Sequence, residues 1–182
     1  MAEKLRFDLT LYPAPVLRQV AEPVLAFDEA LREIAAGMLE AMYEEKGVGL
    51  AAPQVGLRKR ILVLNPSGEK ADELALVNVE IVDRSGLEVR FEEGCLSFPG
   101  IYADVARPER CRVRARDVAG NPIEREFDGF ASRIVQHEYD HLEGILLVDR
   151  MSPADKVRHR AALEALVDRH RRAQAAAKKP RT

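Results

Sequence analysis

The 182-residue chain has two cysteines, no tryptophan and no long apolar run, and these scarcities exclude several classes of protein. Two cysteines cannot form the disulfide framework of a small secreted domain, so a reducing cytoplasm is the expected compartment. No stretch approaches the roughly 18 apolar residues that span a membrane, and residues 1–8 lack the apolar core of a signal peptide. An organellar location would require that a transit peptide has been removed.

The charge is unevenly distributed along the chain. The net charge is −2, yet residues 151–182 hold nine Lys or Arg and only three acidic residues, so the preceding 150 residues are clearly acidic. A basic tail on an acidic body predicts contact with a ribosome or with RNA, whereas direct DNA binding is not expected. The alternative is a solvated helix with a frayed end. The length favours one domain, with residues 151–182 as a basic helical extension of residues 1–150.

The pattern His-Glu-x-x-His lies at residues 137–141. Residues four apart lie on one face of a helix, so His137 and His141 can direct both imidazoles at one metal ion. Glu138 can then reach a metal-bound water without being a ligand. Asp128 is a candidate N-cap and Gly144 a candidate C-terminal stop for this helix. The alternative is that the histidines are only hydrogen-bonded in the core.

The same helical spacing divides the predicted helix into faces. Phe130 and Ile134 continue the stripe of the two histidines and are expected to face inward. The polar residues of the helix are expected to form its back: Arg133, Gln136, Asp140 and Glu143.

Two histidines need a third ligand, and the usual protease solutions fit poorly. Leu147 stands where a third histidine would follow in one class, and Glu164, the downstream carboxylate of another, lies in a charged helical segment. Cys95 lies in a predicted loop and is the best candidate for the third ligand, because a thiolate and two imidazoles together suit zinc and similar metals. Cys111 lies in an alternating strand and is predicted to be structural.

Helices at both ends and strands between them predict an α+β fold, with mostly antiparallel β-sheets around the central metal-binding helix. Asp28 is expected to cap an N-terminal helix that runs to about Glu45 and is ended by Gly47. Strand-like runs occupy residues 60–64, 74–82 and 87–92, and residues 111–117 and 122–127 predict a hairpin. Ser152 and Pro153 are a good start for a C-terminal helix with a partial apolar stripe that includes Val157, Leu163 and Leu166.

The segment 47–56 is rich in glycine and alanine, which would let another backbone approach closely. Within it, Gln54 offers a neutral amide donor that can polarise a carbonyl oxygen. A plain turn is the alternative for this segment.

Three segments in fixed order, 47–54 (GVGLAAPQ), 93–97 (EGCLS) and 136–141 (QHEYDH), together resemble the peptide deformylase family. The resemblance implies removal of the N-formyl group from the formyl-methionine of new polypeptides, releasing formate. It implies that Cys95, His137 and His141 hold the metal, that Glu138 is the general acid/base for attack by a metal-activated water, and that Gln54 and the Leu96 N–H bind the formyl oxygen. The substrate-binding residues expected from the motifs and their surroundings are Val48, Gly49, Leu50, Glu93, Gly94, Phe130 and Ile134.

The resemblance also points to one divalent metal ion per chain, Fe(II) in the cell, with zinc, nickel or cobalt possible in a purified sample. A monomer is expected, with no membrane partner. Tyr102 stands where some relatives carry an arginine that contacts the peptide, so the preference after methionine is left open. Two other functions remain as alternatives: another His-Glu-x-x-His metallopeptidase, and a metal-stabilised, ribosome-associated protein without catalytic activity.

Overall fold

The computed structural model describes residues 5–177. Within these residues there are short 3-10 turns, five helices and five strands, and two of the core clusters lie between the sheet and the first two helices. The elements in chain order are η1 (Pro15–Arg18), α1 (Glu29–Glu44), β1 (Gly49–Ala51), η2 (Ala52–Val55), β2 (Ile61–Leu64), η3 (Lys70–Asp72), β3 (Leu74–Gly94), β4 (Tyr102–Arg116), β5 (Pro122–Asp128), α2 (Gly129–Leu142), α3 (Leu147–Arg150), α4 (Pro153–Arg158) and α5 (Arg160–Ala177).

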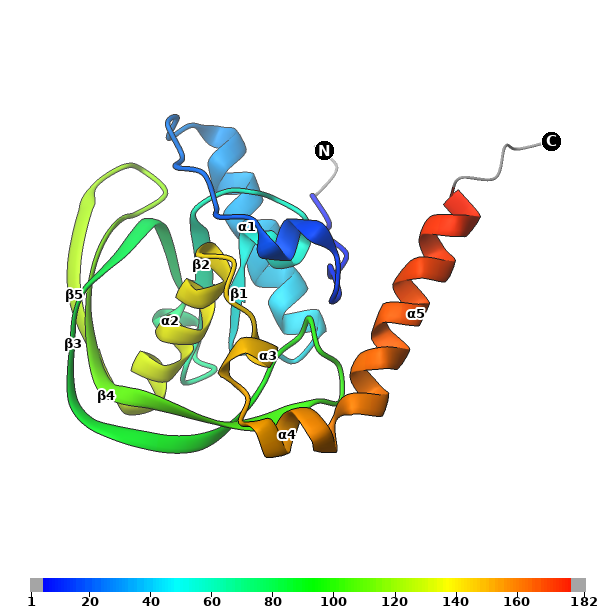
Figure 1. Ribbon diagram of the computed structural model, residues 1–182. Helices are drawn as coiled ribbons and strands as arrows, with labels where there is room; N and C mark the ends of the chain where they lie inside the picture. The colour runs from blue at the N-terminus through cyan, green and yellow to red at the C-terminus, as the bar shows by residue number, and fades with distance from the viewer. Residues whose placement is uncertain (1–4, 178–182) are drawn as a thin grey trace.

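The five strands form one antiparallel sheet in the order β1-β2-β3-β4-β5, so every strand pairs with its neighbour in sequence. The strands β3, β4 and β5 curve around α2, and α1 packs beside β1 and β2 (Figure 1). This arrangement confirms the α+β class with an antiparallel sheet.

The central strands are longer than the sequence indicates. Residues 74–82 and 87–92, predicted as two strands, are one strand of 21 residues. Gly86 lies in the predicted gap between these two strands and has a φ of +81°. The strand continues through it because the β3–β4 pairing has an irregularity between Ser85 and Glu88 that accommodates this conformation. Strand β4 likewise begins at Tyr102, nine residues before the predicted hairpin arm. The predicted hairpin itself is confirmed, since β4 pairs with β5 from Arg116 opposite Pro122.

Helix α1 begins as predicted, because the Asp28 carboxylate accepts a hydrogen bond from the Leu31 N–H at 3.1 Å. Its buried face includes Leu31, Met38 and Met42, in the core cluster that also contains β2 residues. The prediction for its end was wrong in one detail: Lys46, with φ of +57°, takes the left-handed position, and Gly47 follows it. The Gly47 N–H donates to the Met42 carbonyl and closes the turn.

Helix α2 lies in the concave side of the sheet and buries Val135 and Leu142 against it. The predicted start of α2 is confirmed, since Asp128 stands at the N-cap position, but its side chain makes no capping hydrogen bond. This residue also ends β5 and pairs there with Arg110. The expected polar back is not solvated: Gln136 and Asp140 are buried, since the curved sheet wraps that side of the helix too.

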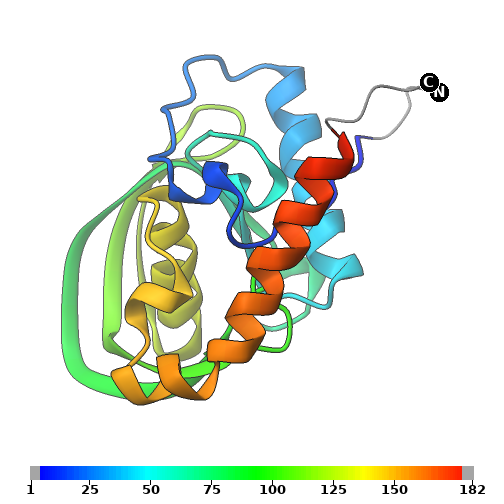
Figure 2. The ribbon, with the colours of Figure 1, turned by 45° about the vertical axis from the view of Figure 1, so that its right-hand side comes forward.

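The C-terminal extension follows the short helix α3 and contains α4 and α5, and α5 runs along the outside of the body (Figures 1 and 2). Ser152 starts α4 as predicted, accepting from the Asp155 N–H. The predicted apolar stripe is only partly realised, because Leu166 is buried whereas Val157 is 64% exposed. The basic residues Lys178, Lys179 and Arg181 lie outside the described residues. None of the helices within residues 5–177 is long and apolar enough to cross a membrane.

Candidate metal centre

Cys95 lies in the turn that connects β3 to β4. The Phe98 N–H donates to the Cys95 carbonyl at 2.8 Å, and the buried Phe98 ring stacks on Tyr12 of the N-terminal arm, with ring centroids 4.8 Å apart. The Tyr12 N–H also donates to the Ser97 carbonyl at 3.0 Å. The arm therefore holds the turn in place and fixes the direction of the Cys95 thiol.

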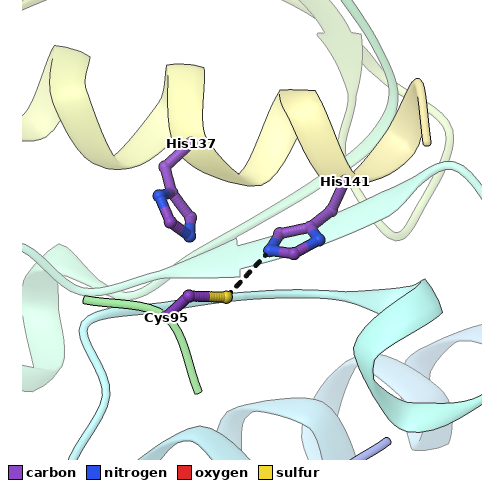
Figure 3. Close-up of side chains that lie close together, drawn as sticks. All are labelled: Cys95, His137 and His141. Carbon is purple, nitrogen blue, oxygen red and sulfur yellow. Dashed lines mark hydrogen bonds between the residues drawn. The ribbon is translucent and has the colours of Figure 1, made fainter. Parts of the chain in front are cut away.

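The thiol of Cys95 faces the two histidines of the motif. The imidazoles of His137 and His141 project from adjacent turns of α2 toward the sulfur (Figure 3). One ligand atom from each of the three residues lies within 4.8 Å of the others, and the Cys95 Sγ is 3.2 Å from the His141 Nε2. A thiolate and two imidazoles form a donor set that suits zinc, iron, cobalt or nickel, and one coordination position would stay open for water or substrate.

Each histidine presents the nitrogen that a ligand would use. The His137 Nδ1 lies 3.0 Å from the Glu93 carboxylate, which leaves its Nε2 for the cluster. Burial would lower the His137 pKa, but hydrogen bonds with Cys95 and Glu93 raise it well above its ordinary value. Burial holds the His141 pKa well below its ordinary value, so this imidazole is neutral, the form that binds a metal.

Glu138 is buried beside the cluster, and within residues 5–177 its Oε2 has no hydrogen-bond partner. Burial raises its pKa to about 7. Gly49 of β1 makes this position possible: a Cβ on Gly49 would lie 2.6 Å from the Glu138 Oε1 and 2.6 Å from the Ile134 Cγ2. Only glycine lets β1 approach α2 this closely.

Gln54 is fully buried in η2, and its amide has a fixed direction. The Oε1 accepts from the Ala51 N–H at 2.8 Å, so the Nε2 must face the other way. That donor lies 3.3 Å from the Ser97 Oγ and 3.6 Å from the Cys95 Sγ. An amide donor is therefore aimed at the cluster.

A cavity of about 520 Å³ opens beside the cluster and brings most of the predicted site together. Two predicted residues are not on its wall: Leu50, whose side chain is fully buried in the core cluster of α1 and β2, and His141, which is buried and contacts the Cys95 thiol instead. Glu93 lines the cavity, but its carboxylate is engaged by Arg107, Arg133 and His137. Predicted residues on the wall are Val48, Gly49, Gln54, Glu93, Gly94, Cys95, Leu96, Phe130, Ile134, His137 and Glu138.

The alternative third ligands lie elsewhere. Leu147 is buried in a separate core cluster with Phe98, and Glu164 lies on α5 beside a groove that Tyr12 lines. Among residues 5–177, the cluster of Cys95, His137 and His141 is the group of potential ligands that could hold a metal.

Comparison with known proteins identifies the family. A family model described as polypeptide deformylase matches residues 7–157. The chain is 48% identical over 161 residues to the peptide deformylase of Alkalilimnicola ehrlichii, an alignment that covers 88% of this chain and 90% of that protein. The chain belongs to the peptide deformylase family.

Solved peptide deformylases share its fold. A crystal structure of Arabidopsis thaliana peptide deformylase 1B with an inhibitor is 42% identical, has a TM-score of 0.88, and is matched over 92% of this chain and 94% of that one. The Thermotoga maritima peptide deformylase structure is 41% identical with a TM-score of 0.78, over 82% of this chain and 99% of that one. The family is metal-dependent, which agrees with the cluster of thiol and imidazoles.

The sequence reasoning missed a buried polar cluster behind the peptide deformylase motif. Arg107 on β4 donates to both Glu93 oxygens, at 2.7 and 2.9 Å, and to the Asp140 carboxylate at 2.9 Å. Burial opposes ionisation of Glu93, but the hydrogen bonds from His137 and Arg107 lower its pKa to about 2. The alternation of β4 gives a usable signal, since it places Arg107 on the inward side with Val105 and Ala103.

Proposed function

We propose that this protein removes the N-formyl group from the formyl-methionine of newly synthesised polypeptides and releases formate. The observation that supports this best is a cluster of one thiol and two imidazoles beside a cavity whose wall also carries a buried carboxylate and an oriented amide. Family membership supplies the substrate class, and the roles below are assigned to this chain's own residues.

Cys95, His137 and His141 would hold one divalent metal ion, and their donor atoms fit it. When bound, the metal supplies Lewis-acid activation of a water molecule at neutral pH. The donor set accepts several metals, and we propose Fe(II) as the one used in the cell. The chain contributes the direction of the ligands, since the β3–β4 turn fixes the thiol and α2 fixes both imidazoles.

Glu138 would move the proton. Its carboxylate is buried next to the cluster and has no competing hydrogen-bond partner at Oε2 among residues 5–177. The carboxylate can accept a proton from the attacking water and deliver it to the leaving nitrogen of methionine. The glycine at position 49 leaves the space that this side chain needs.

Gln54 and Leu96 would bind the formyl oxygen. The Gln54 Nε2 is aimed at Cys95 because the Ala51 N–H holds its Oε1. Leu96 follows Cys95 directly and lines the same cavity, so its backbone N–H is the second proposed donor. Hydrogen bonds that form as the oxygen gains charge stabilise the transition state, and losing one such donor costs about 2.7–4 kcal/mol.

The peptide would bind along β1. This strand is an edge of the sheet, paired with β2 through contacts such as Gly49 with Leu64. An extended peptide can add to such an edge as a further strand. The methionine side chain would enter the apolar part of the cavity, with Val48, Leu96 and Ile134 on the wall and Phe130 at its exposed rim.

Formate release from a formyl-methionyl peptide tests the proposal. The assay is run anaerobically on the Fe(II)-loaded protein and on Glu138→Gln, which keeps the size of the side chain and removes its proton-accepting role. An acetyl-methionyl peptide is the control substrate. We expect activity on the formyl peptide alone, reduced at least 100-fold in the variant. A metal-loaded, folded protein that releases no formate would contradict the proposed function.

The basic charge of α5 supports a second, separate contact. We propose that the C-terminal extension of residues 151–182 is part of the same domain as residues 1–150 and that it binds the ribosome, while the enzyme acts as a cytoplasmic monomer. Double substitution of Arg169 and Arg172 to Glu should weaken co-sedimentation with ribosomes, and added salt should weaken it in the wild type. Binding that ignores both changes would refute a role for this charge.

A further inference from the structure

A line of charged contacts runs from α3, just before the C-terminal extension, to the metal centre. Arg150, the last residue of α3, grips Asp140 of α2 with two hydrogen bonds, from Nη2 to Oδ1 at 2.6 Å and from Nε to Oδ2 at 3.0 Å. Arg107 of β4 contacts the same Asp140 carboxylate and then both oxygens of Glu93. Glu93 contacts the Nδ1 of His137 at 3.0 Å.

The burial of these groups makes their pairing obligatory. The side chains of Arg107, Glu93 and Asp140 are 5%, 5% and 7% exposed. Two buried carboxylates therefore share one buried guanidinium, and the second positive partner of each lies nearer the surface: Arg133 for Glu93 and Arg150 for Asp140. Removing one partner from such a set leaves an uncompensated charge in the interior.

Asp140 also lies between the two proposed histidine ligands in the sequence of α2. It follows His137 by three residues and directly precedes His141, so it belongs to the same two helical turns as both histidines. Contacts from β4 and α3 on this one carboxylate restrain the rotation of those turns. The Glu93 carboxylate, in turn, sets the plane of the His137 ring through its Nδ1.

We propose that Asp140 and Arg150, acting through Arg107, are positioning residues for the metal centre. Asp140 fixes the position of α2 relative to the Arg107 guanidinium. Arg107 aligns the Glu93 carboxylate, and Glu93 aligns the His137 imidazole. Arg150 completes the arrangement from α3, which directly precedes the C-terminal extension. This inference rests on the proposed role of Cys95, His137 and His141 as metal ligands.

The expected size of the effect follows from the place of these residues behind the metal ligands, which they do not replace but orient. Outer partners that orient ligand side chains typically change metal affinity or activity by 10–100-fold when they are removed. Asp140→Asn keeps the shape and removes the charge that Arg107 needs, so we expect a loss at the upper end of that range. Arg150→Met leaves the contact of Asp140 with Arg107 in place, so about tenfold is expected. Arg150→Lys should recover only part of the loss, because lysine cannot make the bidentate contact.

The experiment measures Co(II) binding by competition with a chelator, the visible absorption spectrum of the Co(II) form, and kcat and KM on the Fe(II) form. The matched control is Arg112→Met: this arginine is also on the surface, 46% exposed against 41% for Arg150, and pairs with Glu124 outside the cluster. We expect weaker Co(II) binding, an altered spectrum and a lower kcat with nearly unchanged KM in the Asp140 and Arg150 variants, and wild-type behaviour in the control.

Two outcomes are kept apart by this design. Wild-type protein that fails to bind Co(II) would refute the proposed metal site itself. Wild-type protein that binds Co(II), with folded Asp140→Asn and Arg150→Met variants of equal affinity and spectrum, would overturn the positioning role alone. If Asp140→Asn does not fold, the half-exposed Arg150 and its two variants still decide the question.

Discussion

Alanine at position 49 should separate catalysis from stability more clearly than any change to a ligand. The added Cβ would lie 2.6 Å from both the Glu138 Oε1 and the Ile134 Cγ2, and ordinary contacts begin near 3.4 Å. Glu138 or the whole of α2 must therefore move by roughly 1 Å. A displacement of that size in a reacting group can lower the rate about 100-fold. The overpacking itself should cost about 1–3 kcal/mol of stability.

The assay compares formate release and urea-induced unfolding for wild type, Gly49→Ala and a control, Gly68→Ala. Gly68 has a φ of +82° and open space around it, so alanine there costs about 1–2 kcal/mol through backbone strain without touching the centre. We expect both variants to lose stability but only Gly49→Ala to lose kcat by about 100-fold. A Gly49→Ala enzyme with kcat within threefold of wild type would refute the assigned position and role of Glu138.

Two further predictions concern stability. Asp149→Ala should destabilise the protein by about 1 kcal/mol at pH 7, since the carboxylate accepts from the Leu146 N–H and pairs with Arg18. Burial opposes ionisation of Asp149, but these partners lower its pKa, so its contribution is present above pH ~4 and is lost as the pH falls through the lowered value. Urea unfolding at pH 7 and pH 3 checks this, and a difference between variant and wild type that stays constant would contradict it. Metal removal by a chelator should lower the melting temperature of the wild type, because a metal at 100 times its Kd stabilises the folded state by about 2.7 kcal/mol. The melting temperature of Cys95→Ser, which lacks one proposed ligand, should stay unchanged. Equal shifts in both proteins would argue against Cys95 as a ligand.

The local part of the site is predictable from the sequence because its signals are local. Histidines four apart on an amphipathic stretch specify the geometry of α2, and Gly144, with φ of +70°, ends it as expected. Cys95 is chosen by elimination, since Leu147 and Glu164 fail as third ligands, and the structure brings its thiol to the histidines. Asp28 and Ser152 likewise start their helices through contacts within three residues.

The parts that sequence reasoning missed depend on contacts between distant segments. Asp140 looks like an exposed position on the polar side of α2, and only the curvature of the sheet buries it against Arg107, 33 residues earlier. Gly86 looks like a break between two strands, but pairing with β4 carries β3 through it. The strand β1 is only three residues long and is defined by its partner β2. Each of these features depends on a partner from another part of the chain, so a single segment carries no signal for it.

The strictly sequential order of the sheet has a consequence for the route by which the site forms. Each strand pairs with the one made just before it, so the sheet can grow as a series of hairpins with short loop closures. Helix α2 comes after the last strand and carries two of the three proposed ligands. We therefore expect the thiol of Cys95 to be in place before its partners arrive. Metal capture would then be a late event that marks the completed fold and makes it harder to reverse.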